Sequence, residues 1–71
     1  MKIFSIRLKE EREACEYTQK QMAELLNIPL RTYQNYEALA AINQREPDLE
    51  MLVRISNILD VSTDYLLGKE D

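Results

Sequence analysis

Several residue types that carry common chemistries are absent or scarce in this chain. It has no histidine and a single cysteine, Cys15, so it can form no intramolecular disulfide and cannot supply a four-ligand Cys/His zinc site. Gly68 is its one glycine, which excludes a glycine-rich phosphate loop, and no polar cluster has catalytic spacing. We therefore expect no enzyme: no catalytic residue, no metal ligand and no cofactor.

Long apolar runs are missing as well. The first residues, 1–5, form too short an apolar run for a signal peptide, and no stretch approaches the roughly 20 apolar residues of a membrane span. We therefore expect a cytoplasmic protein with no membrane partner.

The residue types that are present favour packed helices. Leu, Glu, Ala, Lys and Arg are common and there are only two prolines, a composition that suits helices rather than sheets. A chain of 71 residues is expected to form one domain, residues 1–71, which buries only about 60% of its unfolded surface. Its stability should be small, and this favours self-association.

The net charge of −4 argues against a nucleic-acid partner, because domains that bind nucleic acids are usually basic. The charge is unevenly distributed, however. Residues 1–45 contain seven Lys or Arg and six Asp or Glu, a net +1, whereas residues 46–71 contain two and seven, a net −5. A surface that faces phosphate must therefore lie in the first two-thirds of the chain.

Apolar spacing predicts a first helix that ends near Glu16. Phe4, Leu8 and Cys15 form a helical stripe among charged residues. Cys15 is accordingly expected to be a small buried hydrophobic residue and not a reactive thiol.

A capping box predicts the start of a second helix. The Thr18 hydroxyl can accept from the amide of Gln21, whose side chain can reach back to Thr18. Asn27 ends this helix, because asparagine tolerates the left-handed backbone conformation. The buried side of the helix is expected to consist of Met22, Ala23, Leu25 and Leu26.

A third helix is predicted to begin at or beside Pro29, where the missing N–H costs nothing. Tyr33 and Tyr36, three residues apart, give it an apolar side and are expected in the core. The segment Ala38-Leu39-Ala40-Ala41 has high helix propensity and could lengthen this helix.

Two further helices complete the prediction. Pro47 breaks the chain and Asp48 can cap a fourth helix, while Ser62 can cap a short fifth helix that Gly68 closes. The inner side of the fourth helix is expected to contain Leu49, Leu52, Ile55, Ser56 and Leu59, and the fifth helix Tyr65, Leu66 and Leu67. The expected fold is a compact all-α domain of five helices.

The second and third predicted helices are short and are separated by Asn27 and Ile28. This arrangement is typical of a helix-turn-helix, whose second helix can enter the major groove of DNA.

The order and spacing of several motifs are more specific than any one of them. They are Arg7-Leu8-Lys9-Glu10-Glu11-Arg12, Thr18-Gln19-x-x-Met22-Ala23-x-x-Leu26-Asn27-Ile28, Thr32-Tyr33-x-x-Tyr36-Glu37, Glu46-Pro47-Asp48-Leu49-Glu50-x-Leu52 and Leu59-Asp60-Val61-Ser62-x-Asp64-Tyr65-Leu66-Leu67-Gly68. Together they resemble the phage repressor and Cro family of helix-turn-helix domains, which has a lambda-repressor-like fold. The resemblance covers nearly the whole chain and implies a sequence-specific regulator of transcription, a repressor, that binds double-stranded DNA.

The resemblance also implies roles for particular residues. The base-reading positions of the family match Leu30, Arg31 and Asn35, with Thr32 and Gln34 as neighbours. Their chemistry agrees with base recognition, because arginine can bond bidentately to guanine, asparagine can do so to adenine, and a leucine can touch a thymine methyl.

Other residues match positions outside the base-reading set. Gln19 matches a glutamine that contacts phosphate in the family, and we expect Lys20 and Arg45 to contact phosphate too. Arg12 and Glu37 match a pair that bonds between the first and third helices.

The chain departs from the family pattern at three points. Asn27 replaces the usual turn glycine, and Glu11 stands where leucine is common. The segment between Glu37 and Pro47 is longer than in the family, which affects the expected phosphate contacts of its loop, Arg45 included.

Two alternatives stay open at this point. The acidic surface could instead bind a protein partner, as in an interaction module or an antitoxin-like regulator. Leu39 and Ile42 could cover their own domain or join a subunit contact. We expect a homodimer on a palindromic operator, with half-sites about 34–36 Å apart and an interface in the fourth-to-fifth helix region.

Overall fold

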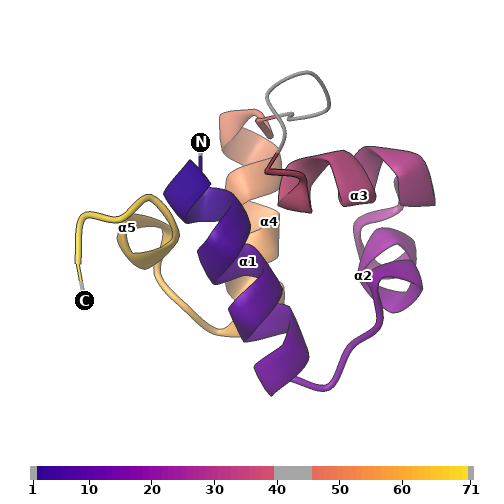
Figure 1. Ribbon diagram of the computed structural model, residues 1–71, viewed down its shortest axis with the longest axis horizontal. Helices are drawn as coiled ribbons and strands as arrows, with labels where there is room; N and C mark the ends of the chain where they lie inside the picture. Colours follow the sequence, from indigo (N-terminus) through magenta and orange to yellow (C-terminus); the bar gives the residue numbers. More distant parts are fainter. Residues whose placement is uncertain (1, 40–45, 71) are drawn as a thin grey trace.

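The computed structural model describes residues 2–39 and 46–70. These residues contain five α helices and no strand, so the expected all-α architecture is confirmed (Figure 1). The helices are α1 (Lys2–Ala14), α2 (Gln19–Leu26), α3 (Leu30–Glu37), α4 (Leu49–Leu59) and α5 (Thr63–Leu66). None of them is long and apolar enough to cross a bilayer.

Helix α1 forms the centre of the molecule. It contacts α3 on one side and α5 on the other, and Figure 1 shows it in front of α4, with α2 and α3 together at one end of the domain. Phe4 and Leu8 on α1 are fully buried. The core consists of Phe4, Leu8, Met22, Ala23, Leu26, Tyr33, Tyr36, Leu52, Ile55, Leu59 and Leu66.

The predicted caps are confirmed. Thr18 Oγ1 accepts from the Gln21 amide at 3.0 Å, and Gln21 Oε1 accepts from the Thr18 amide at 2.8 Å, which completes the capping box of α2. Asp48 caps α4 by accepting from the amide of Met51 at 2.8 Å, and Ser62 caps α5 in the same way. Each of these helices therefore begins where a side chain satisfies its free amides.

The turn between α2 and α3 is fixed from two directions. Asn27 has a φ of 57° and lies in the left-handed region, and the amide of Ile28 donates to the carbonyl of Ala23 at 3.0 Å. Arg54 of α4 reaches over to donate to the carbonyl of Leu26 at 3.0 Å. The end of α2 is thus held by the local backbone and by a helix distant in sequence.

The end of α5 is fastened to α1. Arg7 Nη1 donates to the Tyr65 carbonyl at 2.6 Å, and the guanidinium lies 4.3 Å from the centre of the Tyr65 ring. Gly68 closes α5 with a φ of 82°, and a Cβ there would lie 3.1 Å from Ile3 Cγ2. Glycine is therefore required at Gly68 both by its conformation and by the close approach of Ile3.

Three residues expected inside the molecule are exposed, and those predictions were wrong. Leu25 is 48% exposed and Leu49 is 77% exposed, and Cys15 is exposed too. On α2, Leu25 lies roughly 100° around the helix from the direction shared by the buried residues, at about 100° per residue. Leu49 is the first residue of α4, beyond the cover of other helices. Cys15 lies past the end of α1, with Sγ 4.0 Å from the Leu59 carbonyl.

The expectation that residues 38–41 extend α3 was also wrong for the part that the structure describes. Helix α3 ends at Glu37, and Ala38 is extended, with φ −68° and ψ 137°; residues 40 and 41 lie outside the described residues. The Tyr36 carbonyl, which a longer helix would bond to an amide four residues later, accepts instead from Ser5 Oγ at 2.7 Å. The helix propensity of alanine is worth only tenths of a kcal/mol per residue and does not outweigh this bond.

The left-handed conformation of Asn27 generates a test of the turn. Asn27→Ala should lower the free energy of unfolding by about 1 kcal/mol, because a residue with a Cβ is disfavoured there and alanine lacks the compensating polar side chain. The matched control is Asn57→Ala on the exposed side of α4, which should cost nothing because alanine favours the helix. Urea denaturation followed by circular dichroism measures both; equal losses would contradict the assignment.

Candidate nucleic-acid interface

Helix α3 divides into an inner and an outer face. Its buried residues are Tyr33, Tyr36 and Glu37, which lie on one side at helical spacing. Leu30 is 40% exposed, and Arg31 and Gln34 are exposed on the opposite side. The expected base-reading residues thus share one face, although Thr32 and Asn35 at its borders are half-buried.

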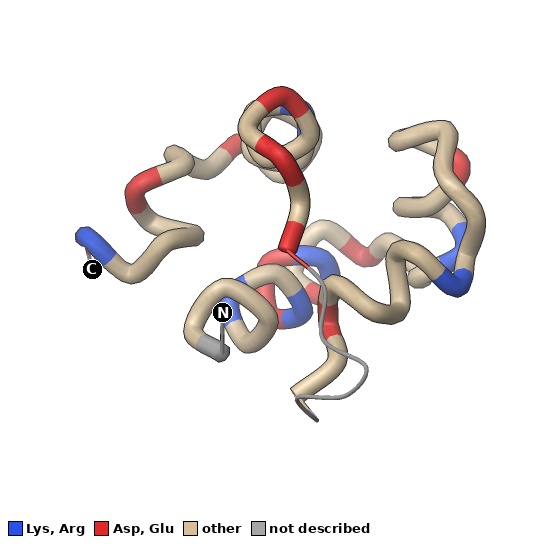
Figure 2. Tube along the Cα trace, turned by 90° about the horizontal axis from the view of Figure 1, so that it is seen from above, with Lys and Arg blue, Asp and Glu red and all other residues tan. Residues whose placement is uncertain are grey.

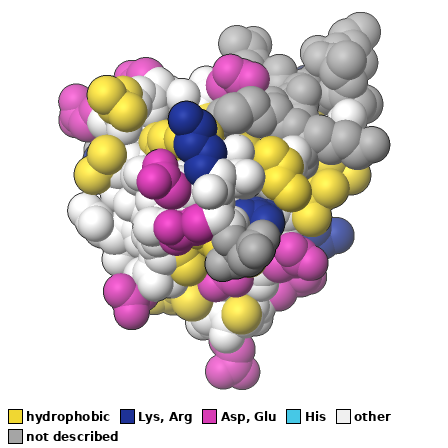
Figure 3. All heavy atoms as spheres, turned by 90° about the vertical axis from the view of Figure 1, so that its left-hand side faces the viewer, with side chains coloured by type: hydrophobic (Ala, Val, Ile, Leu, Met, Phe, Trp, Pro, Cys, Tyr) yellow, Lys and Arg dark blue, Asp and Glu magenta, His cyan; other side chains and the backbone are white. Residues whose placement is uncertain are grey.

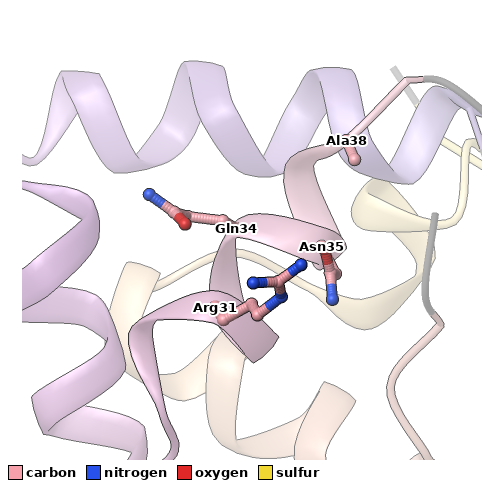
Figure 4. Close-up of a pocket in the computed structure, with 4 residues that line it drawn as sticks. All are labelled: Arg31, Gln34, Asn35 and Ala38. Atoms are coloured by element: carbon pink, nitrogen blue, oxygen red, sulfur yellow. The ribbon is translucent and has the colours of Figure 1, made fainter. Parts of the chain in front are cut away.

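A shallow hollow of about 350 Å³ lies on this outer face. Arg31, Gln34, Asn35 and Ala38 line it, and Figure 4 shows Arg31 and Asn35 extending from the same side of α3, one turn apart. The guanidinium offers only donors, whereas the Asn35 amide offers donors and an acceptor. The hollow can therefore match a polar edge that carries both acceptors and donors.

The inner face holds the ion pair implied by the sequence. Arg12 Nε donates to Glu37 Oε2 at 2.8 Å and Arg12 Nη2 donates to Glu37 Oε1 at 3.2 Å, and the two side chains are only 10% and 4% exposed. Arg12 Nη1 donates to the carbonyl of Tyr17 at 2.8 Å. The hydrogen bonds with Glu37 raise the pKa of Arg12 further, so the guanidinium stays charged.

Tyr33 joins the same carboxylate from within α3. Its hydroxyl donates to Glu37 Oε2, and its ring meets that of Tyr36 edge to face, with the centres 6.3 Å apart. Burial, followed by the bond to Glu37, raises the pKa of Tyr33 well above its ordinary value. The hydroxyl is therefore a donor at any physiological pH.

Gln19 is connected to this network in a way that the sequence did not predict. Its Nε2 donates to Glu37 Oε1 at 3.1 Å, and its Oε1 lies 3.4 Å from Gln34 Nε2, which donates to it. Gln19 is half-buried at the first turn of α2, where a phosphate contact was expected, and Lys20 beside it is exposed. Arg45, the other expected phosphate contact, lies outside the described residues.

The sequence that forms these helices is similar to the sequences of known proteins. The profile described as helix-turn-helix matches residues 8–66, most of the chain. The chain belongs to the phage repressor and Cro-type helix-turn-helix family.

Members of this helix-turn-helix family with curated names are similar over nearly the whole chain. The HTH-type transcriptional regulator ImmR of Bacillus subtilis (strain 168) is 49% identical over 65 residues, 92% of this chain and 48% of that protein. The uncharacterized HTH-type transcriptional regulator YqaE of the same strain is 47% identical, over 96% of this chain and 55% of its own length.

A more distant relative comes from another bacterium. The cryptic phage CTXphi transcriptional repressor RstR of Vibrio cholerae serotype O1 is 38% identical over 63 residues, 89% of this chain and 53% of that protein. The chain therefore spans about half the length of these relatives.

The balance of acidic and basic residues differs between the helix-turn-helix and the rest of the described domain. Arg31 is the one basic residue of α3, and Glu37, its acidic residue, is neutralised by Arg12. Helix α4 contains one acidic residue, Glu50, and one basic residue, Arg54, and Figure 2 shows further acidic residues in the segments on either side of it. Figure 3 shows acidic side chains spread over the face around α5. Within the residues described, no group of three His, Cys, Asp or Glu could hold a metal ion.

The buried ion pair of this helix-turn-helix generates a stability test. Arg12→Ala should cost about 3–5 kcal/mol of unfolding free energy, because it strands the Glu37 carboxylate in the core. The double variant Arg12→Met with Glu37→Leu should recover part of this loss, since no charge is then left unpaired. Arg31→Ala removes the same side chain from an exposed position and should leave stability unchanged. Urea denaturation measures all three; a loss below about 1 kcal/mol for Arg12→Ala would mean that the pair does not hold the fold.

Proposed function

We propose that this domain binds double-stranded DNA by inserting α3 into the major groove, and that it acts as a homodimeric repressor of transcription on a palindromic operator. The observation that carries this proposal is the outer face of α3, where Arg31 and Asn35 lie one turn apart beside a polar hollow. A buried network fixes the opposite face of the same helix. The proposed role is regulatory and involves no catalysis, and its setting is the cytoplasm, where bacterial DNA lies.

Each proposed contact follows from side-chain chemistry. Arg31 would bond to O6 and N7 of a guanine, Asn35 to N6 and N7 of an adenine, and Leu30 would touch a thymine methyl. Thr32 and Gln34 flank these three residues on α3. Gln19, Lys20 and Arg45 would contact the phosphate backbone, which fixes the position of α3 without reading sequence.

The names of the relatives support the regulatory part of this proposal. ImmR and YqaE are named as transcriptional regulators and RstR as a phage transcriptional repressor. This chain spans about half the length of those proteins, the half that contains its helix-turn-helix match.

The proposed dimer follows from the size of α3. Eight residues span about 12 Å, which reads too few base pairs to select one site in a genome. Leu49 and Val53, one turn apart on α4, are 77% and 43% exposed and give a candidate for a two-fold contact. Leu39, 56% exposed, follows α3, and Ile42 lies outside the described residues.

Equilibrium binding to a duplex of random sequence tests the DNA proposal directly. Log affinity should fall linearly with log salt concentration, because phosphate contacts release counterions. Selection of bound duplexes from a randomised pool should then return an operator. Arg31→Ala should weaken operator binding by ~1–3 kcal/mol and relax the preference at one base pair of each half-site.

Two outcomes would count against these assignments. Binding that does not depend on salt, or no binding at all, would favour the protein-interaction alternative. An equal loss of affinity for operator and random duplex in Arg31→Ala would make Arg31 a phosphate contact.

Sedimentation at micromolar concentration, with and without a palindromic duplex, tests the dimer. Leu49→Glu should shift the dimer toward monomer without unfolding it, because this side chain is already exposed within one domain. Ile6→Glu on α1, which is also exposed, is the control and should not. A monomer in both conditions, bound as one copy per duplex, would refute the dimer.

A further inference from the structure

Two hydrogen bonds connect the buried ion pair to the outer face of α3. Gln19 Nε2 donates to Glu37 Oε1 at 3.1 Å, and Gln34 Nε2 donates to Gln19 Oε1 at 3.4 Å. The chain of bonds therefore runs from a carboxylate that is 4% exposed to an exposed amide one turn before the end of α3.

Glu37 determines which groups donate and which accept in this series of hydrogen bonds. A carboxylate paired with an arginine can only accept, so the Gln19 amide must turn its NH₂ group toward Glu37 and its oxygen away. That oxygen then needs a donor, which Gln34 supplies. The orientation of the Gln19 amide is thus fixed at both ends by chemistry, and one N–H of its NH₂ group is left for a further acceptor.

Gln34 is well situated to act on Gln19 rather than on a base. Figure 4 shows its amide directed away from Asn35, although both belong to the outer side of α3. Leu30, at the first turn of α3, has no polar side-chain atom and cannot donate a hydrogen bond to Gln19 Oε1 in place of Gln34. Gln34 is the α3 residue that bonds to Gln19 Oε1.

We propose that Gln34 is a positioning residue, which holds the Gln19 amide in the orientation that donates to a backbone phosphate, and that it does not read a base. This inference rests on the proposed DNA-binding function. Holding one rotamer-rich side chain in place is worth about two- to tenfold in affinity. The gain should be the same for every DNA sequence, because the phosphate backbone carries no sequence information directly.

The experiment measures the affinity of the full chain for one duplex of random sequence and the base preferences selected from a randomised duplex pool. Gln34→Met, which keeps the length of the side chain but lacks its amide, should bind the random duplex about two- to tenfold more weakly and select an unchanged set of base preferences. Gln19→Ala should show the same pattern. Arg31→Ala is the control for base reading and should change the selected preferences.

A double-mutant cycle separates a positioning role from an independent contact. If Gln34 acts through Gln19, the double variant Gln19→Ala with Gln34→Met should bind no more weakly than Gln19→Ala alone. Thermal unfolding of Gln34→Met should match the parent chain, since Gln34 is exposed. Gln19→Ala and the double variant both lack the Gln19 donor to Glu37, so their unfolding temperatures should match each other, and their affinities are compared where both are folded.

Three results are distinguishable. Additive losses in the cycle would overturn the positioning role, and a changed base preference in Gln34→Met would make Gln34 a base reader. Absence of salt-dependent binding by the unmodified chain would overturn the proposed function itself, and this inference with it.

Discussion

The Glu37 carboxylate is the constraint on which the packing of the helix-turn-helix against α1 depends. It accepts hydrogen bonds from Arg12 on α1, Gln19 on α2 and Tyr33 on α3. A buried carboxylate without such donors carries a penalty of several kcal/mol, so these three helices must meet for the domain to be stable. The angle between α2 and α3 therefore follows from the need to satisfy one charge as well as from apolar packing.

Side chains from outside the helix-turn-helix also define where its helices end. Arg54 of α4 donates a hydrogen bond to a carbonyl at the end of α2, and Ser5 of α1 donates one to a carbonyl at the end of α3. These contacts do not involve the outer face of α3, which therefore takes no part in packing the core. Residues such as Arg31 can consequently vary in a protein of this fold without a cost in stability, which separates what the domain recognises from how it folds.

Local patterns in the sequence predicted most of the fold. The features that could not be predicted from the sequence depend on contacts between residues far apart in the chain. The capping box at Thr18 and the left-handed Asn27 involve near neighbours, so composition and spacing suffice to find them. The link from Gln19 to Glu37 joins residues 18 positions apart, and only the packed structure brings them together. The prediction that Leu49 is buried was wrong because apolar periodicity identifies the face of a helix that packs inward, but not how far along the helix other elements cover that face.

The uneven distribution of charge bears on how the domain would search a chromosome. With a net charge of −4, the protein as a whole is repelled by a polyanion, and this repulsion extends over roughly 8–10 Å at physiological ionic strength. An approach led by α3 meets less of that repulsion than one led by α4 or α5, so the field would orient each encounter. Binding to DNA of arbitrary sequence would therefore be weak and short-lived, and most of the competing sites in a chromosome are of this kind. Discrimination would then come from a low background affinity at least as much as from a high affinity for the operator.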